Sequence, residues 1–214
     1  MSHYYKYPRT YHLPWSPGTT SDDKIMHDIS SLKGKKFVIT EKMDGENTNM
    51  YSDRIHARSI DSKDHASRHW VKGLWGSIKN EIPDGWRICG ENIYAKHSIF
   101  YDSLTTYFMV FSIWDENNIC LSWEETGKIC AMLGLQTVPV MEICEFDEGK
   151  LKKLGDWFAS QSSDKEGYVI RNVDVFTYED FSQNVAKWVR AKHVTTDQHW
   201  MFQEIVPNKL KNVD

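Results

Sequence analysis

Seven short runs rich in β-branched and aromatic residues are the feature that most constrains the fold of this chain. They span residues 36–41, 48–57, 86–94, 107–115, 136–142, 166–172 and 184–191, and each ends near Gly, Asp, Asn or Pro. Such residues suit the pleated surface of a strand, and the residues that end each run favour turns. The runs are unevenly spaced, with room for hairpins in some gaps and for helices in others. This mixed order predicts an α+β fold of antiparallel sheets flanked by helices.

Three of the gaps carry apolar residues at helical spacing, and a fourth helix is predicted near the C-terminus. The segments contain Val71, Leu74, Trp75 and Ile78; Ser122 and Glu125, a capping-box pair before a helix that ends near Gly134; Leu151, Leu154, Trp157 and Phe158; and Thr196, Trp200 and Ile205. No repeat, low-complexity tract or Gly/Ser linker marks a boundary. Residues 1–214 are therefore expected to form a single domain.

Composition and charge exclude several classes of protein. The chain is 40% hydrophobic, and its 26 basic and 30 acidic residues leave a net charge of -4. Neither a disordered chain nor a broad basic field for coating nucleic acid is expected. The apolar run at residues 108–111 is far shorter than the roughly 20 residues of a membrane span, and the N-terminus lacks the apolar core of a signal peptide. The four cysteines form no CxxC pair and are expected to be buried thiols. These features predict a soluble, cytoplasmic protein.

The most specific chemical signal is EKMDGEN at residues 41–47. Lys42 follows an apolar strand and precedes an Asp-Gly turn, so its amine is expected at a sheet edge beside a tight turn. An amine placed there is suited to act as a nucleophile. Because the motif is short, a surface lysine that starts a hairpin is the better interpretation of the motif in isolation. Its context decides between the two interpretations.

Four further motifs follow in order: GENIYAKHSI at residues 90–99, YFMVFSIWD at 107–115, EGYVIRN at 166–172 and AKWVRAKH at 186–193. With EKMDGEN, this ordered set resembles the covalent nucleotidyltransferases, and most closely the ATP-dependent RNA ligases. The resemblance spans residues 36–193, and the opening YPRTYHLPWSPG at residues 7–18 is similar to the start of stand-alone RNA ligases. It implies a nucleotidyltransferase domain, an ATP-grasp-like ligase adenylation fold with its ATP pocket between two antiparallel sheets.

The resemblance assigns a role to one residue of each motif. Lys42 is the nucleophile, Glu91 binds the ribose of ATP, and Phe111 stacks on adenine. Glu166 is associated with the metal ion, and Lys187 holds the α- and β-phosphates. Carboxylate oxygens suit Mg²⁺, and an ammonium stabilises the charge that develops as pyrophosphate leaves. For Phe111, an ordinary core position is the competing interpretation.

Three more positions take roles from the family pattern. Glu41 matches a residue that contacts the adenine edge, and Asn47 matches an asparagine that helps to hold a hydrated metal ion. Arg58 resembles an arginine that contacts the nucleotide phosphate or the RNA end, with Arg54 as a close competitor. The alternative for each is a polar residue that flanks a turn.

The last motif departs from the family pattern. The family commonly has a second lysine two residues after the first, and Val189 stands at that position here. Arg190 and Lys192 follow, and we favour Arg190 because its planar fork can grip phosphate through two hydrogen bonds. An aspartate that often follows the stacking phenylalanine is likewise replaced, by Ser112.

The implied reaction uses ATP with Mg²⁺, or with Mn²⁺ in its place. The lysine attacks the α-phosphate and releases pyrophosphate, AMP passes to an RNA 5′-phosphate, and a 3′-hydroxyl then displaces AMP. Lys42 must be neutral when it attacks, and we expect Lys187 and the divalent cation to favour the neutral amine through like-charge repulsion. The partners are therefore RNA 5′-phosphate and 3′-hydroxyl ends, and no membrane.

Alternatives of the same chemistry are a DNA ligase and a capping-type nucleotidyltransferase, both of which normally carry an OB-fold after the last motif. Residue 214 follows soon after Lys192, so we expect no C-terminal OB domain. An inactive nucleotide- or RNA-binding module of the same fold is the alternative from another class, and the intact Lys42 argues against it. With a net charge of -4, RNA contact is expected to be local and salt-sensitive, unless a homodimer or an accessory protein supplies more RNA-binding surface.

Overall fold

A computed structural model describes residues 3–160, 164–191 and 204–211 of the chain. Its first sheet contains β1 (Tyr11–His12), β2 (Lys36–Glu41), β9 (Val140–Glu145), β10 (Gly167–Asn172) and β12 (Val185–Val189). The strand order is β1-β12-β10-β2-β9. Neighbouring strands are antiparallel except β1 and β12, which run parallel.

The second sheet contains β3 (Glu46–Met50), β4 (Ile55–Ala57), β5 (Arg87–Asn92), β6 (Phe108–Trp114), β7 (Ile119–Cys120), β8 (Gln136–Thr137) and β11 (Phe176–Thr177). Its order is β11-β7-β6-β5-β3-β4, with β8 pairing in parallel beside β6. All its other pairings are antiparallel. The two sheets confirm the expected architecture.

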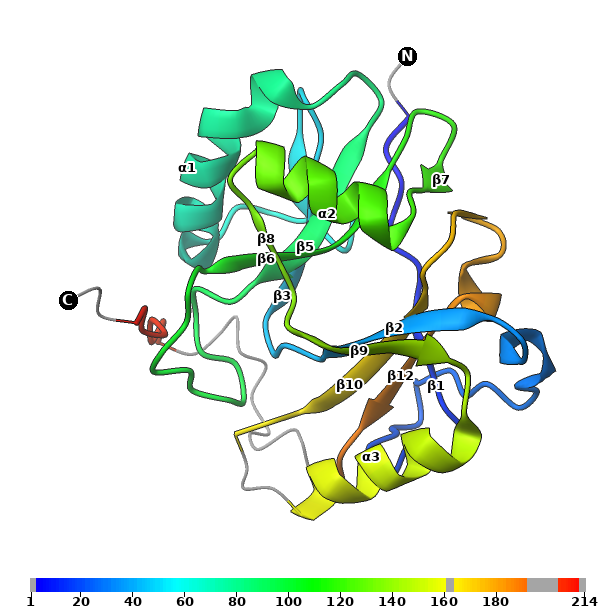
Figure 1. Cartoon of the computed structure of the whole chain (residues 1–214). Coiled ribbons are helices and arrows are strands. Elements are labelled where there is room, and N and C mark those ends of the chain that lie inside the picture. The colour runs from blue at the N-terminus through cyan, green and yellow to red at the C-terminus, as the bar shows by residue number, and fades with distance from the viewer. Residues whose placement is uncertain (1–2, 161–163, 192–203, 212–214) are drawn as a thin grey trace.

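Helices cover the outer faces of both sheets. They are α1 (His69–Ile78), α2 (Trp123–Met132) and α3 (Glu148–Ser160), with short 3₁₀ turns at Ser30–Leu32, Ala66–Arg68, Lys79–Glu81 and Phe181–Gln183. In Figure 1, α1 and α2 lie over the seven-stranded sheet and α3 lies under the five-stranded sheet. The molecule is thus a stack of two sheets between helices, which is the α+β fold that the sequence predicts.

The capping signals in the sequence mark the ends of α2 as expected. The Ser122 hydroxyl accepts a hydrogen bond from the Glu125 backbone N–H, and the Glu125 carboxylate accepts one from the Ser122 N–H. Gly134 follows the helix with a φ of 65°, the left-handed conformation that glycine adopts without strain. For the predicted C-terminal helix, Thr196 and Trp200 lie outside the described residues, and Ile205 stands in an irregular segment.

Two apolar clusters fill the outer layers, and two more lie where the sheets face each other. Phe158 of α3 packs on Tyr168 and Trp188 of the five-stranded sheet, and Val71 of α1 packs with the buried side chains of the other sheet. One inner cluster contains residues of both sheets, the other lies around β6 and the neighbouring loops, and Phe111 contacts both clusters. The inner faces therefore meet around Phe111.

Residues 48–57 form a hairpin rather than the single strand that the sequence predicts. β3 and β4 are antiparallel, with Thr48 opposite Ala57 and Met50 opposite Ile55. The backbone N–H of Tyr51 donates to the Arg54 carbonyl at 2.7 Å, which closes the turn. Composition alone does not reveal this turn, because strand-favouring residues continue on both sides of it.

Residues 136–142 also divide, because the chain passes from one sheet to the other there. β8 pairs with β6 of the second sheet, whereas β9 pairs with β2 of the first. Pro139 lies between them, and its carbonyl accepts a hydrogen bond from the Glu41 N–H at 2.9 Å. Proline has no N–H to donate and suits such a break between strands.

A β-bulge at Phe111 interrupts the alternation of side chains along β6. Cys89 of β5 lies opposite Ser112 and Gly90 lies opposite Val110, so Phe111 is the extra residue. Simple alternation would place Ile113 on the same face as Phe111. Beyond the bulge the faces exchange, and Ile113 instead joins the outer cluster of Phe108 and Val110, since a bulge shifts the side-chain alternation by one residue.

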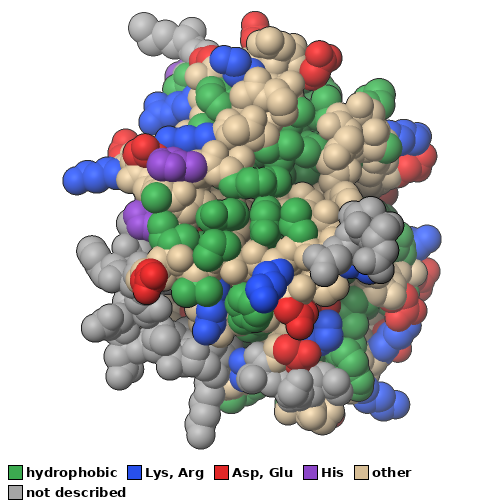
Figure 2. Space-filling model, turned by 90° about the vertical axis from the view of Figure 1, so that its left-hand side faces the viewer, with side chains coloured by type: hydrophobic (Ala, Val, Ile, Leu, Met, Phe, Trp, Pro, Cys, Tyr) green, Lys and Arg blue, Asp and Glu red, His purple; other side chains and the backbone are tan. Residues whose placement is uncertain are grey.

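The surface carries charges of both signs. Figure 2 shows hydrophobic side chains gathered near the middle of one face, with Lys, Arg, Asp and Glu side chains around them. This mixture agrees with the small net charge of -4. Within residues 3–160, 164–191 and 204–211, no helix is both long and apolar enough to span a bilayer.

A pair of glycine substitutions tests the close packing of β10 on β12. A Cβ built on Gly167 lies 2.0 Å from the Trp188 carbonyl oxygen, whereas one built on Gly73 in α1 meets no atom within 4 Å. Gly167→Ala is expected to lower the free energy of unfolding by about 1–3 kcal/mol through overpacking. Gly73→Ala is the matched control and should raise it by about 0.5–1 kcal/mol, because alanine is the better helix former. Urea unfolding monitored by circular dichroism measures both, and equal stability of the two variants would contradict the packing.

Candidate nucleotide-binding site

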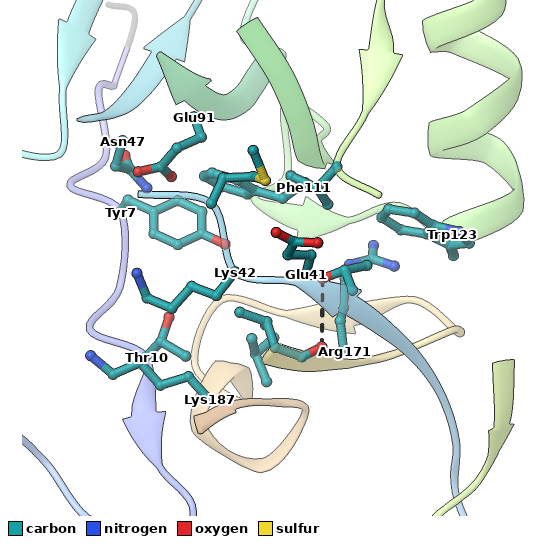
Figure 3. Close-up of a pocket in the computed structure, with 15 residues that line it drawn as sticks. Tyr7, Thr10, Glu41, Lys42, Asn47, Glu91, Phe111, Trp123, Arg171 and Lys187 are labelled. Carbon is teal, nitrogen blue, oxygen red and sulfur yellow. Dashed lines mark hydrogen bonds between the residues drawn. The ribbon is translucent and has the colours of Figure 1, made fainter. Parts of the chain in front are cut away.

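A cavity opens between the inner faces of the two sheets. It encloses about 690 Å³, including space open to solvent, which is within the usual range of about 300–1,000 Å³ for small-ligand sites. Six of the predicted site residues line it: Glu41, Lys42, Asn47, Glu91, Phe111 and Lys187. These residues come from both sheets and lie around one space in Figure 3.

Lys42 follows directly after β2, and its backbone N–H donates to the Gly167 carbonyl at 2.9 Å. Its Nζ lies 2.6 Å from Oε2 of Glu166, the residue that precedes β10. Glu166 is only 6% exposed, so this ion pair is shielded from water on the carboxylate side. The structure thus joins the first and fourth motifs through a charge-assisted hydrogen bond.

The protein groups around Lys42 favour its protonated amine. Burial lowers the pKa of Lys42, but the carboxylates of Glu166 and Glu91 outweigh burial and hold it above the ordinary value. The expectation that Lys187 and a divalent cation together favour the neutral amine stays a prediction, and it did not include these two carboxylates.

Burial has the opposite effect on the pKa of Glu91. It lies in β5, directly after Gly90, and lines the cavity beside Lys42. Burial raises the pKa of its carboxyl group to about 8, with further contributions from Glu166 and Asp44, and Lys42 opposes this rise. With a pKa of about 8, the Glu91 carboxyl group is mostly protonated at neutral pH.

Lys187 lies in the middle of β12 and faces the same cavity. Its amine and that of Lys42 point to the same side in Figure 3, toward the N-terminal segment that carries Tyr7 and Thr10. Burial and the positive charge of Lys42 lower the pKa of Lys187, while Asp23 and Glu166 oppose the decrease. The two lysines are thus electrostatically coupled across the pocket.

Asp44 connects the Lys42 turn to the loop after Glu91. Its Oδ2 accepts hydrogen bonds from the backbone N–H groups of Ser98 and Ile99, each at 2.7 Å. Its own N–H donates to the Tyr101 hydroxyl oxygen at 2.9 Å. The aspartate of the KxDG motif therefore acts structurally here, because it fixes the second motif against the first.

The bulge directs Phe111 into the cavity, where Val138 and Val169 also line the wall. The ring of Phe111 contacts that of Tyr7, with centroids 5.1 Å apart. It is half-buried and belongs to both inner clusters. The ring is thus held in place by neighbouring apolar side chains at the cavity wall, as a stacking platform requires.

Glu41 and Asn47 line the cavity but are already held by neighbours. Glu41 Oε2 pairs with Lys165 Nζ at 2.6 Å, and Asn47 Oδ1 accepts a hydrogen bond from Asn49 Nδ2 at 2.9 Å. Each side chain is therefore held in a defined orientation at the cavity wall.

The two predicted arginines lie farther from the amines. Arg58 lines an outer groove that shares Lys42, Glu91 and Lys187 with the inner cavity, and its Nε donates to the Tyr7 carbonyl at 3.4 Å. Arg190 is absent from the described lining of both spaces, and its Nε donates to the Lys165 carbonyl at 2.8 Å. The role of Arg190 as the second phosphate cation stays a prediction.

The donor set near Lys42 fits a hard cation. Among the residues that the structure describes, no three His, Cys, Asp or Glu side chains form a metal cluster. Mg²⁺ commonly uses only one or two carboxylates, with water and substrate phosphates as further ligands. Glu166 supplies a buried carboxylate, and Asn47 and Glu91 place further oxygen donors on the cavity wall. The site can therefore accept a divalent cation that arrives with a nucleotide.

Several cavity residues were missed by the sequence analysis. Tyr7 and Thr10 come from the opening segment, where only the similarity of residues 7–18 to RNA ligases gave a signal. Trp123 and Arg171 form another part of the wall, with the guanidinium 5.4 Å from the indole centroid. Nothing in the spacing of these residues marks them as neighbours.

The raised pKa of Glu91 predicts how stability depends on pH. The folded protein binds a proton at Glu91 more tightly than the unfolded chain, because the pKa rises from 4.5 to about 8. This contribution is fully present below about pH 4.5 and is lost as the pH rises through about 8. From about pH 5 to pH 8, the stability of Glu91→Gln relative to the unsubstituted protein should therefore increase by at least about 1 kcal/mol.

Urea unfolding across that range, with a metal chelator and without nucleotide, measures this difference. Glu145→Gln, an exposed substitution on β9, is the matched control for the loss of a carboxylate. A difference between Glu91→Gln and the unsubstituted protein that does not vary with pH would contradict the raised pKa.

Comparison with solved structures gives the same fold. An archaeal ATP-dependent RNA ligase matches with 16% identity over 86% of this chain and 48% of its own, with a TM-score of 0.56. A Naegleria gruberi RNA ligase bound to PPi matches with 19% identity over 76% and 51%, with a TM-score of 0.51. A putative ATP-dependent DNA ligase from Aquifex aeolicus matches with 20% identity over 76% and 46%, with a TM-score of 0.50. The chain spans about half the length of these ligases.

A search of curated proteins gives no match. The sequence model of the family described as RNA ligase matches residues 35–189, which is most of the chain. This range contains the cavity residues from Glu41 to Lys187 and both sides of the Lys42–Glu166 ion pair. The chain therefore belongs to the RNA ligase family.

Proposed function

We propose that this protein is an ATP-dependent RNA ligase that forms a lysyl-AMP intermediate on Lys42. In the proposed cycle AMP then passes to an RNA 5′-phosphate, and a 3′-hydroxyl displaces it. The observation that carries the proposal is the convergence of Lys42, Glu91, Phe111 and Lys187 on one cavity, with Glu166 paired to Lys42. A binding module would not require a buried amine in contact with an acid at its centre.

The first step is an in-line substitution at the α-phosphorus of ATP. A bond forms between Lys42 Nζ and phosphorus, and the bond from phosphorus to the pyrophosphate oxygen breaks. Lys42 must first release the proton that Glu166 and Glu91 help to retain. Lys187, whose amine faces the same side of the cavity, stabilises the negative charge that moves onto pyrophosphate.

A divalent cation is proposed to bind with ATP, held by Glu166 and Asn47, as Mg²⁺ or Mn²⁺. Bound there, it supplies positive charge that offsets the phosphates and the carboxylates. A form of the Naegleria gruberi ligase similar to this fold was solved with AMP and Mn. In this chain, the buried Glu166 carboxylate beside Lys42 supports the same use of a cation.

The nucleoside is proposed to bind against Phe111, with the carboxylate of Glu41 at the base edge and Glu91 at the ribose. Phe111 and Tyr7 both line the cavity, and their rings are in edge-to-face contact. Glu41 is held by Lys165 at 2.6 Å, so its position does not depend on the ligand. Pre-positioned groups lose little conformational freedom when the nucleotide binds.

RNA ends are proposed to reach Lys42 through the outer groove, where Arg58 lies. This groove joins the inner cavity at Lys42, Glu91 and Lys187. Because the net charge is -4, few phosphate contacts are available, and a homodimer or an accessory protein is proposed to extend the RNA-binding surface. RNA binding by the isolated chain should accordingly be weak and salt-sensitive.

Radiolabelled ATP with Mg²⁺ tests the first step directly. A labelled band should survive denaturing electrophoresis, with a mass increase of one adenylate, because a phosphoramidate is covalent. Lys42→Ala should abolish the label, and the control Lys36→Ala should retain it, since Lys36 is exposed at the start of the same strand. Label on another lysine, or persistence of the label in Lys42→Ala, would refute the assignment. Sealing of 5′-phosphorylated RNA but not DNA then separates RNA ligase from DNA ligase.

Kinetics separate nucleotide binding from chemistry. Lys187→Ala and Glu166→Ala should slow adenylation on the order of 10²-fold, because their charges act as pyrophosphate leaves. Phe111→Ala should mainly raise the KM for ATP by roughly tenfold, since stacking is available in the bound ground state. Phe111→Tyr keeps the ring and should leave KM nearly unchanged. Rapid-quench assays measure these values, and a kcat effect confined to Phe111→Ala would contradict the assigned roles.

A further inference from the structure

The N-terminal segment, residues 7–26, lies outside the range matched by the family model and yet contacts the phosphate-binding strand. β1 pairs in parallel with β12, with His12 opposite Lys187. The Leu13 N–H donates to the Lys187 carbonyl at 2.8 Å, and the Gly18 N–H donates to the Val189 carbonyl at 2.9 Å. In Figure 1 this segment runs down past both sheets. It is therefore placed to influence Lys187.

Asp23 is the residue of this segment that faces the Lys187 amine. One of its oxygens, Oδ2, accepts hydrogen bonds from the Thr20 N–H at 3.0 Å and the Thr20 hydroxyl at 2.9 Å. The other, Oδ1, lies 3.3 Å from His12 Nε2 and 3.5 Å from Lys187 Nζ. Thr20 thus fixes the carboxylate and leaves Oδ1 directed at the two cationic or donor groups.

A hydrogen-bond chain sets the orientation of His12, which is 1% exposed. The Ser16 hydroxyl oxygen accepts from the Val189 N–H at 2.9 Å and lies 2.8 Å from His12 Nδ1. The Ser16 proton is best placed to go to Nδ1, because the alternative acceptor, the Val189 carbonyl, is 3.3 Å away. The imidazole proton is then on Nε2, the atom that faces Asp23.

The ion pairs formed by Lys42 and Lys187 differ in length. Lys42 and Glu166 are 2.6 Å apart, a short charge-assisted hydrogen bond, whereas Lys187 and Asp23 are 3.5 Å apart. At 3.5 Å the attraction is mainly electrostatic, so the N–H groups of Lys187 remain available to phosphate oxygens. A carboxylate at this distance can hold an ammonium in place without competing for its donors.

We propose that Asp23 is a positioning residue, held by Thr20 and His12, that keeps the Lys187 ammonium directed at the phosphates of ATP. Lys42 repels Lys187 from one side, and Asp23 attracts it from the other. This inference rests on the proposed function, because Lys187 is its point of action. It extends the working site into a segment that the family match does not include.

The test is single-turnover adenylation with labelled ATP, in the unsubstituted protein and in Asp23→Asn. Loss of the charge should lower the adenylation rate on the order of tenfold, with little change in the KM for ATP. Asp28→Asn is the matched control in a neighbouring loop. Asp28 accepts equivalent hydrogen bonds from the N–H and hydroxyl of Ser30, and it is exposed. The control should adenylate at the unsubstituted rate.

A double-mutant cycle distinguishes positioning from a general structural role. In a Lys187→Ala background, Asp23→Asn should change the adenylation rate less than about twofold, because the ammonium that Asp23 positions has been removed. An equal loss in both backgrounds, or an unchanged or faster rate in Asp23→Asn alone, overturns the inference. Absence of adenylation in the unsubstituted protein overturns the proposed function instead, so the two failures are distinguishable. Thermal unfolding of each variant confirms that folded proteins are compared.

Discussion

Backbone pairing between β2, β10 and β12 determines where the charges of the site meet. Tyr168 lies opposite Glu41 on one side and Trp188 on the other, which places Lys42 beside Gly167 and one residue from Glu166. A slip of one residue would send every side chain of a strand to the opposite face. The 2.6 Å contact between Lys42 and Glu166 therefore depends on the register of the whole sheet.

This register brings together charges that oppose one another in the ligand-free protein. Glu166 and Glu91 keep Lys42 protonated, and the same crowding keeps Glu91 partly protonated near neutral pH. The pocket is stable in this state, in which the Lys42 amine is protonated and therefore unreactive. In the proposed function, reactivity requires positive charge beside the carboxylates, so the proposed nucleophile and the proposed metal ion belong to one electrostatic arrangement.

Much of the fold followed from local patterns, because strands and caps depend on neighbouring residues. The capping box at Ser122 and Glu125 is an example, since both partners are within one helical turn. The order of motifs also predicted which residues line one cavity, although their roles stay predictions. Local patterns did not reveal the bulge at Phe111 or the change of sheet at Pro139, because both depend on the pairing partner rather than on the residue itself.

The electrostatic state of Lys42 and the part played by Asp23 were beyond sequence reasoning for a different reason. Each depends on contacts between segments that are far apart in the chain, such as Asp23 with Lys187. No composition or spacing rule links a carboxylate before the first long strand to a lysine in the last one. Only the pairing of β1 with β12 places them together.

That pairing also bears on how the protein folds. Tyr11 finds its partner at Ala186, so the edge of the sheet beside Lys187 is completed by residues separated by most of the chain. Contacts of such long range form late, since the entropy of closing a large loop must be overcome first. During synthesis, β1 emerges early and has no partner strand until β12 has followed it. The side of the pocket that carries Lys187 is therefore among the last parts of the molecule to assemble, and a chain without β12 lacks it.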